Sequence, residues 1–446
     1  MLKLHPNRCE LLWSDTQAPL FTDFSGNISV CDWLQQLQSV ISYCQQQNGQ
    51  RVLLFQPDSY QFSLWFCALA HLGKQILLAP NNQPATMQAL TQQTDWQTPA
   101  QLPAPVADPA IPAALSINTA TQVIFFTSGS TGTPKLVNRR LSQLLLEVST
   151  LEQHFGAALP ANILFAATVS HQHIYGLLFR ILWPLSCERR LYRPQLSYFE
   201  QWQALLQQHN MVLIASPAHL SRFEELPALT TYQHQLHAIF SSGGPLADHL
   251  PTYYRQHTGQ TPYEIFGSTE TGGIAYRQRQ QADTCWQAFS NIALSQSADG
   301  CLLIRSPYVD EQADYQTQDL VRLLANNRFD LLGRADRIVK VEEKRLSLTE
   351  LEKCCLQHPL ITAAVALLLP QQPRQKLALV AVLTEQGRQQ LQQLGHRAIS
   401  QQIKQHLLTQ FELVLLPKKF RYVAQLPYNE QGKLPQRQLE SLFADG

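Results

Sequence analysis

Short, uninterrupted apolar runs recur along the first two thirds of the chain, and they constrain its fold more than any other feature. They lie at residues 52–55, 163–169, 211–215, 237–240 and 263–266, and helical patterns separate most of them. Runs of this length without alternation are typical of strands that are buried on both faces, as in a parallel sheet. The sequence therefore predicts an α/β fold with mainly parallel sheets.

The clearest repeat of this pattern is a strand, a helix and a second strand at residues 52–55, 58–72 and 75–78. Asp58 stands where a helix N-cap is expected, and Gly73 where a C-cap is expected. Residues 98–113 contain five prolines and several alanines, which indicates an extended surface connector. Ligands of such folds bind in loops that leave the carboxyl ends of strands, so functional residues are expected there.

The pattern of expected helices and strands changes at about Gly333. Short helices are expected at residues 348–357 and 399–411, and compact apolar strands at 361–369 and 377–383. A chain of 446 residues is longer than one hydrophobic core usually organises. We therefore expect a large domain of residues 1–335 and a small, mobile α+β domain of residues 336–446.

Composition excludes several classes of function. The formal net charge is +1 and 15% of residues are charged, so no strong field favours nucleic acid or an anionic membrane as a partner. No run of eighteen apolar residues occurs, and residues 1–15 lack the apolar core of a signal peptide. The nine cysteines are scattered without a C-x-x-C pair, which favours reduced thiols. Together these features lead us to expect a cytoplasmic protein without a membrane span.

Residues 125–137, with the sequence FFTSGSTGTPKLV, follow an apolar run and combine five hydroxyl residues, two glycines and one lysine. Glycines let backbone N–H groups approach an anion closely, hydroxyls add donors, and lysine adds a compact positive charge. A plain Ser/Gly turn is the simpler alternative. A Walker loop needs four residues between its glycines, and here only Ser130 and Thr131 separate Gly129 from Gly132.

The segment TSGSTGTPK resembles the phosphate loop of the adenylate-forming superfamily, which contains acyl-CoA synthetases, nonribosomal adenylation domains and luciferases. The resemblance extends over about residues 50–440. It implies a large N-terminal adenylate-forming domain with a small C-terminal lid. It also implies that ATP phosphates are bound by Thr127, Ser128, Gly129, Ser130, Thr131, Gly132 and Lys135.

Two further motifs follow strands. Residues 241–246 read SSGGPL, where two glycines let a flat ligand lie against bare backbone, although a tight turn explains them equally well. Residues 265–273 read IFGSTETGG, which resembles the family's aromatic-Gly-x-Thr-Glu motif. The resemblance implies that Thr269 meets the α-phosphate and that Glu270 binds Mg²⁺. It places adenine and ribose against Gly243, Gly244, Pro245, Phe266, Gly267 and Ser268.

Three later segments complete the resemblance. Residues 315–319, YQTQD, end in Asp319, which is expected to take the ribose hydroxyls. Residues 333–336, GRAD, place Arg334 at the ribose and make Asp336 the hinge between the domains. A Gly-Lys pair at residues 432–433 supplies the catalytic lysine, Lys433, which is expected to bridge the substrate carboxylate and the α-phosphate. Alone, such a lysine is usually a solvated charge.

Residues 171–176, HQHIYG, contain two histidines that could form a metal pair or lie half-buried in the core. The resemblance places His173 in the wall of the acid pocket, with Ser242 and Gly267, and we count it with Lys433 among the catalytic candidates. Amino-acid-activating relatives carry an Asp here, and residues 169–173 contain none. This difference argues against an amino-acid substrate.

Glu343 departs from the family pattern, because it stands where the family usually has a glycine that lines the pantetheine tunnel. The segment EEKR at residues 342–345 resembles the stand-alone ligases of aryl-polyene and xanthomonadin pigment clusters. A solvated acidic pair is the alternative.

We expect an ATP- and Mg²⁺-dependent ligase that converts a small-molecule carboxylic acid to acyl-AMP. The acyl group is then transferred to CoA or to a phosphopantetheinylated acyl carrier protein. The substrate is expected to be a hydroxybenzoate- or hydroxycinnamate-like aryl acid, or else a medium-chain fatty acid. A ligase without the thioester step and a non-enzymatic carrier-binding module are the alternatives.

Overall fold

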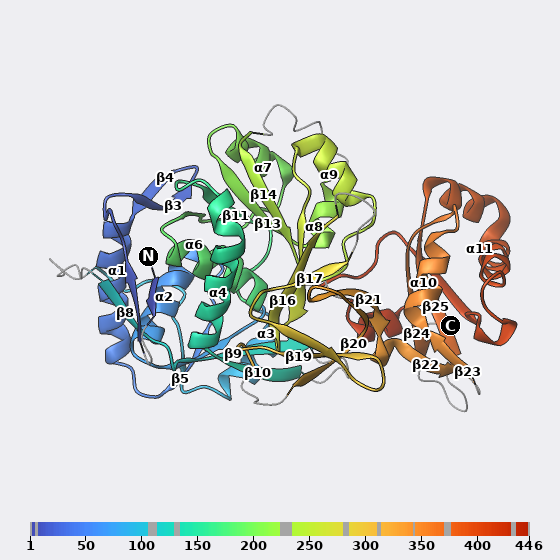
Figure 1. The fold of residues 1–446 in the computed structure, drawn as a ribbon, viewed down its shortest axis with the longest axis horizontal. Helices are drawn as coiled ribbons and strands as arrows, with labels where there is room; N and C mark the ends of the chain where they lie inside the picture. Colours follow the sequence, from blue (N-terminus) through green and yellow to red (C-terminus); the bar gives the residue numbers. More distant parts are fainter. Residues whose placement is uncertain are drawn as a thin grey trace.

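The computed structural model describes residues 2–4, 8–105, 114–128, 134–223, 234–279, 285–309, 314–341, 344–369, 376–429 and 434–444. The side chains of residues 2–4, 127, 128, 134, 135, 340 and 345 are not described. The molecule is elongated: most elements gather at one end, and a smaller group that includes α10, α11 and the last strands lies at the other end (Figure 1).

A mixed sheet of thirteen strands runs through the large part in the order β18-β19-β20-β21-β17-β16-β15-β14-β13-β11-β12-β3-β4. From β15 to β3 each neighbouring pair is parallel. The strands of this parallel centre are β3 (Pro19–Asp23), β11 (Leu164–Ala167), β12 (Arg190–Tyr192), β13 (Met211–Ala215), β14 (Leu236–Ser241) and β15 (Tyr263–Ser268). The antiparallel strands are β4 (Gly26–Ser29), β16 (Gly272–Gln278), β17 (Trp286–Ala288), β18 (Ala293–Gln296), β19 (Cys301–Arg305), β20 (Tyr315–Leu324) and β21 (Arg328–Arg334).

A second sheet has the order β10-β9-β6-β5-β7. Its strands are β5 (Arg51–Leu54), β6 (Gln75–Leu78), β7 (Trp96–Gln97), β9 (Gln122–Ser128) and β10 (Pro134–Arg140), and only the β9–β10 pair is antiparallel. A small antiparallel sheet joins β1 (Leu2–Leu4), β2 (Arg8–Leu12) and β8 (Ala114–Asn118). The expected α/β class is confirmed, and its parallel centre is extended by an antiparallel wing.

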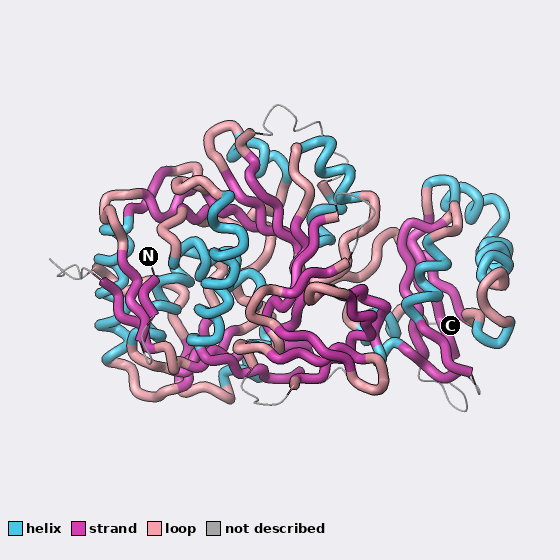
Figure 2. The backbone as a smooth tube through the Cα atoms, in the orientation of Figure 1, coloured by secondary structure: helices cyan, strands magenta, loops and turns pink. Residues whose placement is uncertain are grey.

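Helices pack between and around these sheets (Figure 2). The longer ones are α1 (Val30–Gln45), α2 (Ser59–His71), α4 (Leu141–Phe155) and α9 (Leu250–Thr258). The shorter ones are α3 (Pro84–Thr91), η1 (Gly156–Ala158), α5 (Ile174–Gly176), η2 (Leu177–Leu182), α6 (Trp183–Ser186), α7 (Phe199–Leu206) and α8 (Pro217–Arg222). As expected, the Asp58 side chain caps α2 by accepting a hydrogen bond from the N–H of Gln61, at 2.9 Å.

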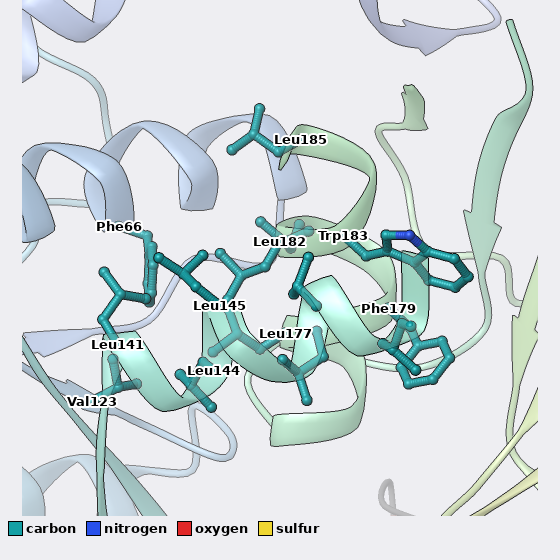
Figure 3. Packing of buried hydrophobic residues seen from close by; sticks show 14 of the residues in the cluster. Phe66, Val123, Leu141, Leu144, Leu145, Leu177, Phe179, Leu182, Trp183 and Leu185 are labelled. Atoms are coloured by element: carbon teal, nitrogen blue, oxygen red, sulfur yellow. The ribbon is translucent and has the colours of Figure 1, made fainter. Parts of the chain in front are cut away.

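The largest hydrophobic cluster surrounds α4. Figure 3 shows Leu141, Leu144 and Leu145 of this helix beside Leu177 and Leu182 of the segment that follows His173. Each of these five side chains is at most 4% exposed. Burial of such a leucine stabilises the fold by about 1.5–3 kcal/mol, so α4 is a rigid support for whatever its other face contacts.

The C-terminal part has sheets and cores of its own. β22 (Ile338–Val341) pairs with β23 (Lys344–Ser347), and β24 (Ile361–Leu369), β25 (Lys376–Leu383) and β26 (Lys419–Val423) form a separate sheet. With η4 (Ala335–Arg337), α10 (Leu348–Leu356), α11 (Glu385–Leu407), η5 (Leu413–Leu415) and α12 (Gln436–Ser441), they contain two hydrophobic clusters built only from residues after 338. These observations support the division at residues 335 and 336, which stays a prediction.

The expected helix at residues 399–411 is wrong in its bounds. α11 begins at Glu385 and ends at Leu407, with Gly395 in a left-handed conformation (φ 80°) at an internal kink. Its first half is rich in glutamine and has no apolar stripe, so hydrophobic periodicity did not reveal it. Of the expected connector, residues 106–113 lie outside the described part, and the preceding residues 98–105 are irregular. No helix among the described residues has the length and hydropathy that crossing a membrane requires.

Candidate active site

The phosphate-loop motif lies on the hairpin of β9 and β10. The apolar run before it is a buried strand, in which Val123, Ile124 and Phe125 are at most 3% exposed. Thr127 pairs with Lys135 and Ser128 with Pro134, so the hairpin brings the two ends of the motif together. Gly129, Ser130, Thr131 and Gly132 lie outside the described residues, and the side chains of Thr127, Ser128 and Lys135 are not described. Their contacts with phosphate therefore stay predictions.

The SSGGP segment leaves the carboxyl end of β14, next to β15 in the sheet. The Ser242 hydroxyl donates a hydrogen bond to the carbonyl of Ile265, at 2.9 Å. Gly243 has a φ of 95°, a conformation that favours glycine. This hydrogen bond holds the segment against the start of the second motif. The predicted nucleotide contacts of Gly243, Gly244 and Pro245, and the predicted acid contact of Ser242, stay predictions.

The FGSTETGG motif forms the tip of the β15–β16 hairpin. Phe266 packs against Trp286 and Phe329, with ring centroids 5.2 and 5.6 Å away. Its neighbours Gly267 and Ser268 are exposed. The aromatic ring is thus held in place by two others, beside a stretch of backbone that is open to a flat ligand.

The turn at this tip is fixed by hydroxyl groups. Thr271 Oγ1 accepts a hydrogen bond from the N–H of Ser268 at 3.0 Å and donates one to the carbonyl of Gly272 at 2.9 Å. Thr269 and Glu270 lie at the end of the turn and are partly exposed. One carboxylate with neighbouring hydroxyls fits Mg²⁺ that is carried by a nucleotide, because Mg²⁺ usually takes one or two protein carboxylates together with phosphate oxygens.

Two charged residues that the sequence analysis missed support this turn from behind. Arg139 of β10 donates from Nη1 to the carbonyl of Thr269 at 2.9 Å and to that of Glu270 at 3.4 Å. Glu147 of α4 accepts the N–H of Gly273 at 2.6 Å. Burial raises the pKa of Glu147 to about 7, although the Arg139 guanidinium and the Gly273 N–H act in the opposite direction.

A signal for these two residues was present in the sequence. Arg139 interrupts the buried positions of an alternating strand, two residues after Val137, and Glu147 lies in the apolar stripe of α4 between Leu144 and Leu151. A charge at a core position is rarely tolerated unless it has a partner, so each residue indicated a buried polar contact.

Asp319, Arg334 and Asp336 form one ionic cluster. Asp319 and Arg334 are paired in the β20–β21 register, and Arg334 Nη1 lies 3.4 Å from Asp319 Oδ1. Arg334 also contacts Asp336 through Nε at 2.9 Å and Nη2 at 2.6 Å. Burial raises the pKa of Asp319, partly offset by Arg334. The residues predicted for ribose binding and for the hinge therefore share one guanidinium.

The histidine segment follows β11. His173 is the N-cap residue of α5 and is partly buried. His171 is 1% exposed, and its Nε2 lies 2.7 Å from the carbonyl of Gln56, which Gln172 also contacts. Burial holds the pKa of His171 well below its usual value, so this ring is a neutral core histidine. Within the described residues, no group of three metal-ligating side chains includes either histidine.

Several predicted positions lie on segments that hydrogen bonds link together, and others are not placed. The β9–β10 hairpin, the 266–273 turn and the segment after β14 are joined by the contacts of Arg139 and Ser242. Lys433 and Glu343 lie outside the described residues. Their roles, like those of all the site residues, stay predictions.

Comparison with known proteins finds a matching family and a related ligase. Residues 74–293 match the family described as AMP-binding enzyme. Over 222 residues the chain is 30% identical to 4-coumarate–CoA ligase of Rhodobacter capsulatus, a region that covers 49% of this chain and 53% of that protein. These matches bear out the predicted resemblance to the adenylate-forming superfamily.

Solved structures share the fold over nearly the whole chain. ATP-bound MatB from Rhodopseudomonas palustris superposes with a TM-score of 0.75 at 15% identity, covering 97% of both chains. A benzoate CoA ligase from Burkholderia xenovorans LB400 gives 0.74 at 15% identity, covering 95% of this chain and 97% of that one. The sequence match, by contrast, spans only about half the length of the coumarate ligase. The superfamily prediction is confirmed, and the resemblance to pigment-cluster ligases stays a prediction.

Proposed function

We propose that the protein is an ATP-dependent acid–thiol ligase that works through an acyl-AMP intermediate. The observation that carries this proposal is the hydrogen bond between Arg139 and the carbonyl of Thr269. It joins the strand that leaves the phosphate loop to the turn that carries Thr269 and Glu270, although about 130 residues separate them. Within a family of AMP-binding enzymes, this contact supports a single site for the triphosphate and its metal.

In the first half-reaction, a carboxylate oxygen of the substrate attacks the α-phosphorus of ATP. The bond from that phosphorus to the bridging oxygen breaks, and pyrophosphate leaves. The 127–135 loop holds the β- and γ-phosphates, and Thr269 holds the α-phosphate. Mg²⁺ bound at Glu270 supplies charge neutralisation. Lys433 places a fixed positive charge between the two anions that must approach each other.

The nucleoside is held by groups on the antiparallel wing and beside it. Phe266 stacks on adenine next to Gly243, Gly244 and Pro245, and Asp319 accepts hydrogen bonds from the ribose hydroxyls. Arg334 now divides its contacts between Asp319 and Asp336. When ribose hydroxyls occupy Asp319, the contact between Arg334 and Asp319 changes, and with it the contact that Arg334 makes with the hinge residue Asp336.

In the second half-reaction, the small domain turns about Asp336 and a phosphopantetheine thiol attacks the acyl carbonyl. The carbon–oxygen bond to AMP breaks, and the thiol proton is released. Enclosure of the intermediate excludes water, which would otherwise hydrolyse it. Residues 336–446 contain fifteen Lys and Arg against ten Asp and Glu, a balance that supports a phosphate-bearing acceptor.

An aryl acid, hydroxybenzoate- or hydroxycinnamate-like, is the substrate that we propose first. Two relatives are named for aryl acids, coumarate and benzoate. The segment 169–173 has no carboxylate to pair an α-ammonium group. A medium-chain fatty acid is the alternative. CoA and a carrier protein both remain as acceptors, and Glu343 in place of glycine favours an altered thiol-transfer step.

The test is mass spectrometry of the products. Purified protein, ATP and Mg²⁺ are incubated with a panel of aryl and fatty acids, alone, with CoA, or with a holo-carrier protein. The proposal expects acyl-AMP and pyrophosphate without acceptor, and an acyl thioester when the correct acceptor is present. Acyl-AMP that accumulates while neither CoA nor the carrier protein is acylated would favour the ligase without a thioester step. ATP binding without any turnover would contradict an enzymatic role.

A further inference from the structure

Two buried charges lie behind the predicted magnesium-binding turn, and neither has a part in the reaction described above. Arg139 is 3% exposed and Glu147 is 2% exposed. Both belong to the elements that directly follow the phosphate loop, β10 and α4. The turn that they contact lies more than a hundred residues later, at the tip of the β15–β16 hairpin.

Arg139 contacts the main chain of that turn at the two residues that carry its chemistry. Its Nη1 donates to the carbonyls of Thr269 and Glu270, at 2.9 and 3.4 Å. A hydrogen bond from a charged donor is stronger and shorter than a neutral one, and a guanidinium fixes direction as well as distance. The backbone from which the Thr269 hydroxyl and the Glu270 carboxylate project is therefore tied to β10.

Glu147 holds the other side of the same turn. Its Oε1 accepts the N–H of Gly273 at 2.6 Å. A Cβ added to Gly272, which has a φ of 71°, would lie 2.5 Å from Glu147 Oε2, and one added to Gly273 would lie 3.0 Å from Oε1. The two glycines thus let the main chain lie directly on the carboxylate.

A contribution to folding stability does not by itself explain why Arg139 and Glu147 are buried. Removal of a carboxylate and a guanidinium from water is costly, and well-packed apolar residues at such positions are often as stable or more stable. Both side chains instead hydrogen-bond to the backbone of one turn, at Thr269, Glu270 and Gly273. The geometry fits a pair of residues that fixes this turn relative to β10 and α4.

We propose that Arg139 and Glu147 are positioning residues for MgATP, which hold the backbone of Thr269 and Glu270 in place beside β10 and α4. This inference rests on the proposed function, because it assumes that the site binds MgATP. It predicts that loss of either side chain weakens ATP binding while recognition of the acid is unchanged.

The test compares Arg139→Met with Arg189→Met. Arg189 is also buried, at 5% exposed, and its Nη2 contacts Glu152 at 2.6 Å on the same helix, α4. Its other hydrogen bond goes to the carbonyl of Gly156, at 3.3 Å, so this pair does not contact the turn. Each of the two variants therefore removes one buried guanidinium, and only Arg139→Met removes one that contacts the turn.

Binding of a non-hydrolysable ATP analogue with Mg²⁺ is measured by calorimetry, which requires no knowledge of the acid. We expect Arg139→Met to bind about 10- to 100-fold more weakly than the wild type, and Arg189→Met to bind within about twofold of it. In pyrophosphate exchange, Arg139→Met should raise the KM for ATP and leave the KM for the acid unchanged. Equal affinities of Arg139→Met and Arg189→Met would overturn the positioning role.

Conservative variants distinguish a loss of ATP affinity from a general loss of stability. Arg139→Lys keeps one charged donor and should recover part of the lost affinity, whereas Glu147→Gln keeps the acceptor for Gly273 and should weaken binding less than Glu147→Leu. If all four substitutions lower the melting temperature without this order of ATP affinities, the residues are merely structural and the inference is wrong. Wild-type protein that binds the analogue but never forms acyl-AMP would contradict the proposed function and leave the positioning role standing.

Discussion

Replacement of Gly267 by alanine tests the geometry of the predicted nucleotide site most sharply. Gly267 lies opposite Gly273 in the β15–β16 register. A Cβ at this position would be 2.0 Å from the carbonyl oxygen of Gly272, whereas real Cβ atoms essentially never come closer than 3.0 Å. The clashing atom belongs to the backbone of β16, which cannot relieve the clash by changing rotamer as a side chain can. The two strands must therefore separate by about 1 Å or more at this point.

The cost follows from that displacement. Overpacking of a tight site costs about 1–3 kcal/mol, and a backbone contact places Gly267→Ala at the upper end. An unfolding entropy of about 2.1 cal/mol/K per residue gives about 0.7 kcal/mol/K for a domain of roughly 335 residues, so about 3 kcal/mol lowers Tm by about 4 °C. The same carbonyl of Gly272 accepts the Thr271 hydroxyl, so its movement also disturbs the turn that carries Glu270.

The assay combines thermal unfolding with calorimetric binding of the ATP analogue. Gly387→Ala is the matched control, because its Cβ would lie 2.6 Å from the carbonyl oxygen of Leu360, far along the chain from the nucleotide motifs. Both variants should melt at lower temperature, but only Gly267→Ala should lose most of its affinity for the analogue. Wild-type affinity in a folded Gly267→Ala protein would refute the site geometry.

Three further outcomes are expected. Lys433→Ala should slow pyrophosphate exchange by about 100-fold or more, since it removes a charge that acts on the transition state, while thiolysis of pre-formed acyl-AMP should proceed normally. Asp319→Asn should raise the KM for ATP by about 10-fold or more, since the ribose hydroxyls lose a charged acceptor. Burial raises the pKa of Glu147 in the folded protein to about 7, so the folded state binds more protons than the unfolded state between its ordinary value of 4.5 and about 7. The free energy of unfolding should therefore fall as pH rises through that window, and titration of Glu147→Gln by chemical denaturation should show a flatter profile.

The sequence was sufficient for the parallel centre of the fold, because its strands are short apolar runs buried on both faces. Met211–Ala215 is an example in which all five residues are buried. The antiparallel wing was harder to predict, since strands such as β20 and β21 are exposed on one side and carry charges such as Arg322 and Asp330. Their pairing depends on register between distant segments, and no local pattern encodes that register.

The candidate site, too, has parts that the sequence predicts and parts that only the fold reveals. Motifs with an unusual local composition, such as the phosphate loop, could be recognised along the chain. Arg139 and Glu147 could not be connected, because their common partner is main chain at residues 269–273. The shared contacts of Arg334 with Asp319 and Asp336 were also hidden, since they depend on how β20 and β21 pair.

Acid-dependent exchange of pyrophosphate into ATP tests the central claim most directly. Labelled pyrophosphate, ATP and Mg²⁺ are incubated with the protein and each acid of a broad panel, and with no acid. Reversible formation of acyl-AMP predicts labelled ATP only when a suitable acid is present, and none when it is omitted. Exchange that persists without acid, or that fails with every acid, would contradict the assignment of this chain as an acid-activating ligase.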